Sequence, residues 1–565
     1  MTHLRQTLLA ALCVAATLFS CKPKQNSATL ILYNGVIYTA TETKPTVQAV
    51  AINNGTIVGV GTDTEIRSSF SSAKMVDLQG RAVFPGFTDS HAHLESLGQL
   101  LIDVNLEGTT SVQQIRNMVA ERAATLPAGE WLRGRSWDQN DWEKKDFPTH
   151  EMLDDVAGDH PVALRRVDGH ALWVNAKAIQ LARVTRSTKD PSGGKIQRDS
   201  RGNPTGVFVD NAMDLIDAVM PALTNEERTT AIQKAVQECI AHGLTEVHDM
   251  GVDLEAIDIY KKLISEKSFP FRVYVAVDGI NKTWAYYSKE GPDTGGHDGR
   301  LTVRALKLYA DGALGSRGAE LLTDYSDDPG NRGLVVTPID SMKRAAAVAL
   351  TKGFQVCVHA IGDAANRNVL NMYESVLKAD AMHANNSRFR IEHAQVVSQE
   401  DIPRFAQLGV IPAMQQTHCT SDMYWAEQRL GPERVKGAYA WRSLIEAGSI
   451  IPGGSDFPVE SVNPLLGFYA AITRQDAKGW ADGGWYPGER MTREEALKSF
   501  TVWAAYAAFE ENVRGSIEPG KWADFTVLSN DIMKCDTKEI LSTKVMYTII
   551  AGDIVYAANE KGNPR

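Results

Sequence analysis

Residues 83–93 read VFPGFTDSHAH, an apolar run that ends in His-Ala-His. This pattern predicts a buried strand, and because side chains alternate along a strand, His91 and His93 project to the same side. Two imidazoles on one side supply half of a metal site. A pair of polar residues that merely closes a strand fits the same letters equally well. Further ligands must therefore come from elsewhere in the chain.

The length and the charge of the chain limit its architecture and its partners. A chain of 565 residues exceeds one ordinary domain and predicts a barrel-sized core with a smaller unit beside it. The net charge is -10 and no basic run offsets it, which argues against a nucleic-acid partner. A small neutral, zwitterionic or cationic molecule is the expected substrate.

The N-terminus predicts a targeting segment. The apolar segment 8–19 is too short to span a bilayer and has the length of a signal-peptide core. Residues 18–21, LFSC, resemble a bacterial lipobox, in which cleavage leaves a lipidated cysteine. We therefore expect a signal peptide at 1–20, a lipid on Cys21 and a flexible tether at 21–28. The protein would then be anchored by lipid to a membrane of the bacterial cell envelope and face the periplasm; a plain secretory peptide is the alternative.

Both ends of the chain are rich in short apolar strands. Residues 29–82 contain several such runs around a tight Asn54-Gly55 turn, and residues 513–560 repeat the pattern. We expect one small composite β-sandwich domain built from both termini. Two independent caps are the alternative.

The middle of the chain, residues 83–512, repeats an amphipathic helix, a glycine, and a short apolar strand that ends on a polar residue. The glycines stand where a helix needs a left-handed C-cap. Apolar strands that alternate with helices form a parallel sheet, and this many units predict an α/β fold, a closed TIM-like (β/α)8 barrel. The chemistry of such a barrel lies where its strands end. The pattern recurs at 229–248, 341–359, 399–415 and 441–456.

Residues 101–223 depart from this pattern and contain many tryptophans and loop-forming residues. We expect an insertion after the first barrel strand that folds over the barrel mouth. Trp137 is a candidate for the wall of a substrate pocket. A place in the aromatic core of the insertion is the alternative.

Five polar residues stand at predicted strand ends: His91, His93, His359, His393 and Asp456. Each has a simple explanation by itself, as a core histidine or a helix cap. In a barrel, however, all five side chains converge on one point of the mouth, which predicts a metal site.

Lys307 stands inside the apolar strand 304–312, RALKLYADG, where a lysine is costly unless it is paired or chemically altered. A carbamate formed with carbon dioxide would be an anionic ligand that bridges two cations. An ion pair with Asp311 is the alternative, and the residues alone do not separate the two.

Several motifs occur together in one order along the chain. They are PGFTDSHAH at 85–93, Lys307 followed by DGALGSR at 311–317, VHAIGD at 358–363, IEHA at 391–394 and GSDFP at 454–458. In this order they resemble the amidohydrolase superfamily, and most closely its branch of N-substituted formamide deformylase-like hydrolases. The resemblance spans essentially the whole chain after the signal segment.

The resemblance implies a composite β-sandwich beside a metal-dependent barrel. It also implies which strands carry the metal ligands. These are His91 and His93 from strand one, Lys307 from strand four, His359 from strand five, His393 from strand six and Asp456 from strand eight.

The same resemblance implies a mechanism. Two divalent cations, expected to be zinc, would lower the pKa of a shared water, and the resulting hydroxide would attack the carbonyl of an amide-like, non-peptide C–N bond. Asp456 would take the proton and pass it to the departing nitrogen. Asp89 stands two residues before His91 on the same side of the predicted strand, which makes it a candidate to orient a ligand imidazole. Asp168, His170 and Arg317 are candidate substrate contacts, with structural ion pairs or loop hydrogen bonds as equal alternatives.

Two other functions stay open at this point. One is a non-catalytic lipoprotein that binds a solute in a decayed barrel, and the other is a deaminase or cyclic amidase of the same superfamily. The complete ligand set favours an enzyme over a binding protein. A homodimer is a candidate assembly.

Overall fold

A computed structural model describes residues 25–558. The predicted signal peptide, the predicted lipidation site at Cys21 and the start of the tether lie outside these residues. Within 25–558, no helix is both long and apolar enough to cross a membrane.

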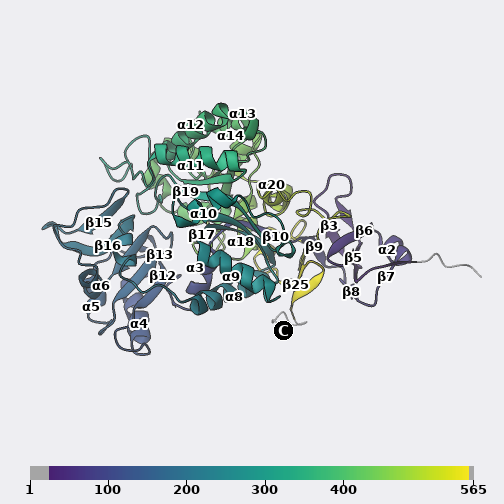
Figure 1. The fold of residues 1–565 in the computed structure, drawn as a ribbon, viewed down its shortest axis with the longest axis horizontal. Coiled ribbons are helices and arrows are strands. Elements are labelled where there is room, and N and C mark those ends of the chain that lie inside the picture. Colours follow the sequence, from purple (N-terminus) through teal and green to yellow (C-terminus); the bar gives the residue numbers. More distant parts are fainter. Residues whose placement is uncertain (1–24, 559–565) are drawn as a thin grey trace, which may run out of the picture.

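Eight strands form a parallel barrel at the centre of the molecule (Figure 1). Each strand pairs with the next one in chain order, as the helix-strand pattern predicts. The barrel closes where β23 meets β10, and there the Asp456 N–H donates to the His91 carbonyl oxygen at 2.7 Å. The predicted TIM-like barrel is confirmed. Its strands are β10 (Phe87–Ala92), β17 (Leu244–Val252), β18 (Arg272–Asp278), β19 (Leu301–Tyr309), β20 (Gln355–Ala360), β21 (Arg390–His393), β22 (Ile411–Gln415) and β23 (Gly453–Gly454).

Helices between the strands cover the outside of the barrel (Figure 1). Two of them end at the glycines that the sequence marks as caps: α11 (Ile339–Lys352) ends at Gly353, with φ 78°, and α14 (Ile402–Leu408) ends at Gly409, with φ 66°. Only glycine adopts this left-handed conformation without a steric penalty, so the helix stops there and the chain turns into the next strand. The other two predicted helices are α8 (Asn225–Ala241) and α17 (Trp441–Glu446).

The stretch 83–93 forms two strands, so the prediction of one continuous strand is wrong. Its first part, β9 (Ala82–Pro85), pairs with β24 (Phe525–Leu528) outside the barrel, whereas β10 belongs to the barrel. Gly86 lies between them, and a larger residue does not fit there because its Cβ would lie 2.3 Å from Thr245 Oγ1. The apolar letters continue across this point, and no local signal shows that the chain changes sheet.

Strands from both ends of the chain share one six-stranded sheet, in the order β26-β25-β24-β9-β3-β4. A four-stranded sheet, β6-β5-β2-β8, shares a hydrophobic cluster with it that includes Leu32, Val50, Phe525 and Ile549. The division of the chain into separate domains stays a prediction. The further strands are β2 (Leu30–Tyr33), β3 (Val36–Tyr38), β4 (Thr46–Val47), β5 (Ala49–Asn53), β6 (Thr56–Gly61), β8 (Met75–Asp77), β25 (Val545–Ile550) and β26 (Asp553–Ala557).

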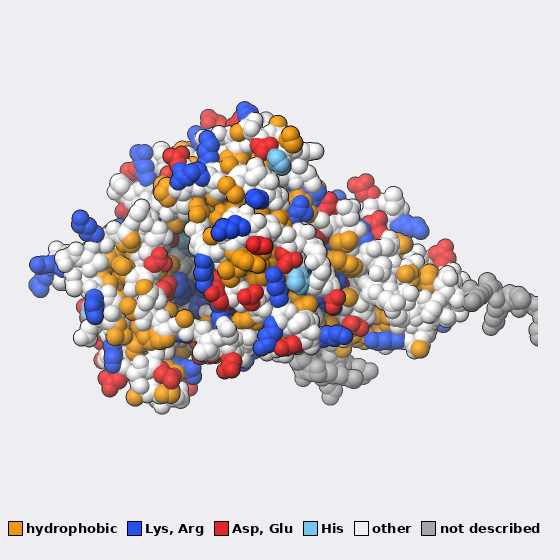
Figure 2. Space-filling model, in the orientation of Figure 1, with side chains coloured by type: hydrophobic (Ala, Val, Ile, Leu, Met, Phe, Trp, Pro, Cys, Tyr) orange, Lys and Arg blue, Asp and Glu red, His pale blue; other side chains and the backbone are white. Residues whose placement is uncertain are grey.

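The segment 101–223 contains a second large sheet, in the order β11-β12-β13-β14-β16-β15. It follows α3 (Leu94–Leu100) and lies on the other side of the barrel from the sheets of the chain ends (Figure 1). Trp137, Trp142 and Trp173 pack together in its core, with ring centroids 6.0 to 6.2 Å apart. Figure 2 shows a hollow between this insertion and the barrel. The strands are β11 (Val104–Asn105), β12 (Leu132–Trp137), β13 (Val162–Arg166), β14 (Ala171–Val174), β15 (Gly194–Arg198) and β16 (Pro204–Asp210).

Candidate metal centre

The side chains predicted as metal ligands come from the ends of barrel strands or from the residues that follow them. The ends of parallel barrel strands lie at one edge, so these side chains meet at the barrel mouth. The ligand atoms of three of them, His91, His393 and Asp456, lie within 4.8 Å of one another. The full set is His91 and His93 at the end of β10, Lys307 on β19, His359 on β20, His393 on β21 and Asp456 after β23.

Two imidazole lone pairs point at the same carboxylate oxygen. His91 Nδ1 lies 2.6 Å from Glu392 Oε2, and His93 Nδ1 lies 2.9 Å from the Met250 carbonyl oxygen. Both partners are acceptors, so each ring, when neutral, carries its proton on Nδ1 and has a lone pair on Nε2. His93 Nε2 is 3.1 Å and His91 Nε2 is 3.5 Å from Asp456 Oδ1. Acceptors that face one another so closely repel unless a proton or a cation lies between them, so these groups could hold a metal ion.

His393 and His359 extend this cluster. His393 Nδ1 lies 2.8 Å from Gln415 Oε1, which again leaves Nε2 free. His359 Nε2 is buried and has no hydrogen-bond partner within the described residues. The ring centroids of His359 and His393 are 4.6 Å apart, and those of His91 and His393 are 4.7 Å apart. Buried imidazole nitrogens without a donor fit a divalent cation.

Lys307 is buried, and its Nζ lies 3.2 Å from His91 Nε2. It forms no ion pair with Asp311, whose carboxylate instead accepts the backbone N–H groups of Ile361 and Gly362 at 3.0 and 2.8 Å. Burial lowers the pKa of the Lys307 amine below its usual value. A neutral amine is a nucleophile, so this lysine is suited to react with carbon dioxide.

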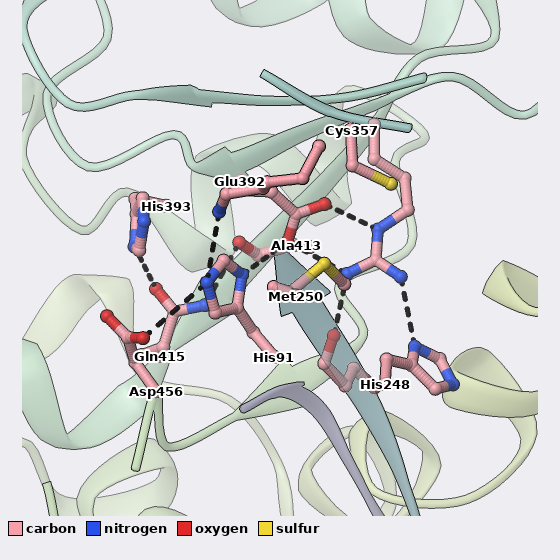
Figure 3. Close-up of polar contacts among 12 residues, drawn as sticks. His91, His248, Met250, Cys357, Glu392, His393, Ala413, Gln415 and Asp456 are labelled. Carbon is pink, nitrogen blue, oxygen red and sulfur yellow. Dashed lines mark hydrogen bonds and ion pairs between the residues drawn. The ribbon is translucent and has the colours of Figure 1, made fainter. Parts of the chain in front are cut away.

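Glu392 is the carboxylate that orients a ligand imidazole. Its carboxylate contacts His91 on one side and Arg390 on the other, and Arg390 in turn contacts His248 (Figure 3). The Glu392 carboxylate pairs with the Arg390 guanidinium at 2.7 Å, and Arg390 Nη1 lies 2.9 Å from His248 Nδ1. The guanidinium neutralises a carboxylate that would otherwise be an isolated buried charge. This arrangement fixes both the tautomer and the direction of the His91 ring.

Asp89 does not contact an imidazole, so its predicted orienting role is wrong. Its carboxylate accepts the His91 backbone N–H at 3.1 Å, the Ser455 backbone N–H at 3.0 Å and the Ser455 hydroxyl at 2.6 Å. Asp89 therefore ties β10 to the loop that carries Asp456. The spacing in the sequence places Asp89 near His91, but only the fold shows which atoms of the neighbouring loop face it.

Burial favours the neutral form of three of these imidazoles. Burial lowers the pKa of His91, His359 and His393 well below the usual histidine value. His393 and Asp456 also have left-handed backbones, with φ 73° and 60°. Such strain costs roughly 1–3 kcal/mol per residue and is concentrated at functional sites.

A cavity of about 380 Å³ opens at the ligands, and both the barrel and the insertion form its wall. Two predicted substrate contacts, Asp168 and His170, line it. His170 Nδ1 lies 2.6 Å from Asp210 Oδ1, and its ring centroid is 5.0 Å from that of His359. Asp168 accepts the His170 backbone N–H at 3.0 Å.

The other two predicted substrate contacts are not part of this wall. Trp137 is 0% exposed, and its Nε1 donates to the Leu164 carbonyl oxygen at 2.7 Å inside the insertion. It therefore occupies the aromatic core that the sequence left as the alternative. Arg317 pairs with Asp327 at 3.0 Å. This is the structural ion pair that the sequence analysis gave as the alternative to a substrate contact.

Sequence reasoning missed several residues of the site. Arg135 and Arg165 of the insertion and Tyr309 of β19 line the cavity, and Glu392 binds His91. A carboxylate directly before a ligand histidine was the available signal for Glu392. The arginines stand in an insertion without a motif, so no local pattern connects them with the barrel mouth.

These features place the chain in a known class of protein. It belongs to the amidohydrolase family, whose sequence profile matches residues 74–556.

Individual relatives extend this assignment. The chain is 35% identical over 539 residues to the putative amidohydrolase YtcJ of Bacillus subtilis. The aligned region covers 93% of this chain and 99% of that protein. It is 26% identical over 549 residues to the N-substituted formamide deformylase of Arthrobacter pascens, covering 93% and 98%. A crystal structure of an uncharacterized metal-dependent hydrolase from Pyrococcus horikoshii matches the fold with a TM-score of 0.73 and 28% identity, over 90% of this chain and 99% of that one.

Proposed function

We propose that this protein is a metal-dependent hydrolase that cleaves an amide-like, non-peptide C–N bond of a small molecule. The family and the names of two relatives, a putative amidohydrolase and an N-substituted formamide deformylase, support the choice of bond. The observation that carries the proposal is the pair of imidazole lone pairs, on His91 and His93, that face Asp456 Oδ1 at 3.5 and 3.1 Å.

The proposed cofactor is a pair of zinc ions. When bound, such cations lower the pKa of a water molecule toward neutrality and polarise the substrate carbonyl. Lys307 is the proposed bridging ligand, as a carbamate, because its buried amine has no acidic partner in the described residues. The residues that would hold the ions are His91, His93, Lys307, His359, His393 and Asp456.

Asp456 is the proposed proton carrier. Its Oδ1 faces the ligand nitrogens, and its side chain lines the cavity in which the substrate would lie. Hydrolysis adds a water oxygen to the carbonyl carbon and breaks the C–N bond. Asp456 would accept the proton of the attacking water and deliver it to the departing nitrogen. Asp168 and His170 would hold the substrate from the side of the insertion, with His170 oriented by Asp210.

Elemental analysis and a substrate panel test this proposal. We expect two divalent ions per chain, and turnover of at least one class among formamides, N-acyl amino acids and cyclic amides. A constant content of one ion after addition of metal and bicarbonate would contradict the two-ion site. Ammonia release without loss of an acyl group would indicate a deaminase. Saturable binding of a solute with no turnover would indicate a binding protein.

Two substitutions separate metal assembly from proton transfer. Lys307→Ala should deplete the metal, because a methyl group cannot replace a carbamate ligand, and added short-chain carboxylic acids should restore part of the activity. Asp456→Asn should lower turnover by about 100-fold or more, the usual scale of general acid-base catalysis. Metal content and circular dichroism must accompany the rates. Near-normal turnover of a folded, metal-loaded Asp456→Asn protein would exclude Asp456 as the proton carrier.

A further inference from the structure

Arg135 is a cation in the cavity wall without a partner in the protein. It stands on β12 of the insertion and lines the same cavity as the metal ligands. Within residues 25–558 its guanidinium makes no hydrogen bond or ion pair, and its Nε is buried without an acceptor. Arg166, on the neighbouring strand, shows the usual solution, because it pairs with both Asp138 and Asp168. Buried polar groups are normally satisfied, so an exception requires a reason.

A second arginine lies beside Arg135, and its positive charge makes the charged form of Arg135 less favourable in the folded protein. Arg135 and Arg165 are direct neighbours across β12 and β13, and both line the cavity. Arg165 pairs with Asp217 at 3.1 Å, whereas Arg135 has no counterion. Burial and then Arg165 lower the pKa of Arg135 to about 10, so the group is still a cation at neutral pH. A charged side chain that destabilises the fold because it has no partner in the protein is typical of a functional site, where a bound ligand supplies that partner.

The acids of the same wall do not serve as this counterion. Asp168 is occupied by Arg166 and by the His170 backbone N–H. Asp210 is held by His170, Asp456 faces His91 and His93, and Asp214 is exposed. None of these four acids forms an ion pair with Arg135 among the described residues, although Asp456 and Asp168 act on its pKa in the direction opposite to burial. The guanidinium lies against Gly169, in the loop that carries His170, where a Cβ would be 3.4 Å from Arg135 Nη2. It is therefore beside a residue that we propose to contact the substrate.

We infer that Arg135 binds a carboxylate of the substrate, so that the enzyme acts on small amides that carry a carboxylate. This inference rests on the proposed hydrolase function. A guanidinium matches a carboxylate through two parallel hydrogen bonds, which would orient the amide toward the ligands of the barrel. Figure 2 shows Lys and Arg side chains in the hollow between the insertion and the barrel. The net charge of -10 pointed to a neutral, zwitterionic or cationic substrate, but the field inside a cleft depends on the nearest charges.

A second cavity, of about 330 Å³, begins at the same arginines. It shares Ser96, Arg135 and Arg165 with the first cavity. A substrate carboxylate bound to Arg135 would lie where the two cavities meet. An apolar side chain on the carbon atom that carries this carboxylate could therefore enter the second cavity. Leucine derivatives are therefore suitable probes. The apolar part of the second wall consists of Leu100, Ala163, Leu172, Met220, Pro221 and Leu223.

The test compares racemic N-formyl-leucine with N-formyl-leucinamide on the metal-loaded enzyme. The wild-type protein should hydrolyse the acid with the higher kcat/KM. Arg135→Gln should lower kcat/KM for the acid by about 10- to 100-fold, the scale of one charge-assisted interaction. The change should appear mainly in KM, and the amide should be unaffected. Arg135→Lys should restore part of the preference for the acid.

Arg201→Gln is the matched control, because Arg201 is an exposed arginine of the same insertion. The melting temperature gives a second readout: Arg135→Gln should leave it unchanged or raise it, because Arg135 has no partner to lose. A lower melting temperature with equal loss for acid and amide would show a structural role and overturn the inference.

Calorimetric binding of N-formyl-leucine to the metal-loaded protein separates this inference from the proposed function. Equal hydrolysis of acid and amide, unchanged in Arg135→Gln, would overturn the carboxylate site and leave the hydrolase intact. Binding that depends on Arg135 without any hydrolysis would support the site and contradict the hydrolase. Absence of both binding and hydrolysis would overturn the carboxylate site.

Discussion

The imidazole of His91 is oriented by Glu392, a residue 301 positions further along the chain. Glu392 in turn pairs with Arg390, which lies on the same strand. The ligand nitrogen of His91 therefore depends on a carboxylate that need not touch the metal or the substrate. Such outer contacts fix the direction of a ligand and increase its basicity.

At this scale we predict that Glu392→Gln lowers metal affinity by about 10- to 100-fold, because the amide is a weaker acceptor for the His91 Nδ1–H. Competition with a chelator measures the affinity. Glu246→Gln is the control, since Glu246 is also a buried barrel carboxylate but pairs with Arg514 at 2.8 Å. Equal metal affinity in wild type and Glu392→Gln would contradict the orienting role.

One buried arginine joins residues that follow two strands of the insertion sheet. Arg166 stands at the end of β13, is 1% exposed, and pairs with Asp138 and Asp168. Its Nε also donates to Gln139 Oε1 at 2.8 Å. The residues that follow β12 and β13 are thus joined through a single guanidinium.

We predict that Arg166→Met destabilises the insertion by about 3–5 kcal/mol, the cost of leaving buried charges without their partner. Hydrogen exchange of β12 and β13 measures this locally. Arg116→Met should cost at most about 1 kcal/mol, because Arg116 pairs with the exposed Asp155. Unchanged exchange in Arg166→Met would show that the network does not support the sheet.

At the scale of the whole molecule, the barrel separates two units with different roles. The insertion lies on one side and contributes to the cavity wall, and the sheets of the chain ends lie on the other side (Figure 1). A buried bidentate pair joins the latter to the barrel: Arg272 of β18 contacts Asp524 at 2.7 and 3.0 Å.

We predict that Asp524→Asn lowers the melting temperature at neutral pH and that this difference shrinks in acid. Burial alone would raise the pKa of Asp524, but Arg272 holds it below the ordinary value of 3.8. Because the pKa of Asp524 is lower in the folded than in the unfolded protein, its charged carboxylate stabilises the fold above about pH 4. This stabilisation is lost as the pH falls below that value. Melting curves between pH 7 and 3 test the sign. A difference that grows in acid would contradict the assignment.

We also propose that the mature protein begins at Cys21 and is held to a membrane by lipid. The apolar segment 8–19 has signal-peptide length, and LFSC at 18–21 resembles a lipobox. Cys21→Ala should move the protein from the membrane fraction to the soluble periplasmic fraction. Unchanged sedimentation with membranes would contradict the lipid anchor.

Much of the barrel could be predicted from local patterns. The glycines at 353 and 409 end helices because their φ angles require it, and the apolar strands that follow need burial on both faces. His359 and His393 stand on such strands, and His91 and Asp456 at or just after them, so sequence position alone indicated that they meet.

Contacts between distant segments were decided only by the tertiary structure. The turn at Gly86 into a different sheet, the place of Trp137 in a core, and the pairing of Glu392 with His91 depend on barrel closure and on how the insertion sheet packs. Arg135 is the clearest case, because an arginine becomes significant only when the groups around it leave it without a partner. The local sequence determines which element forms and which face is apolar, whereas the neighbours of a side chain depend on residues hundreds of positions away.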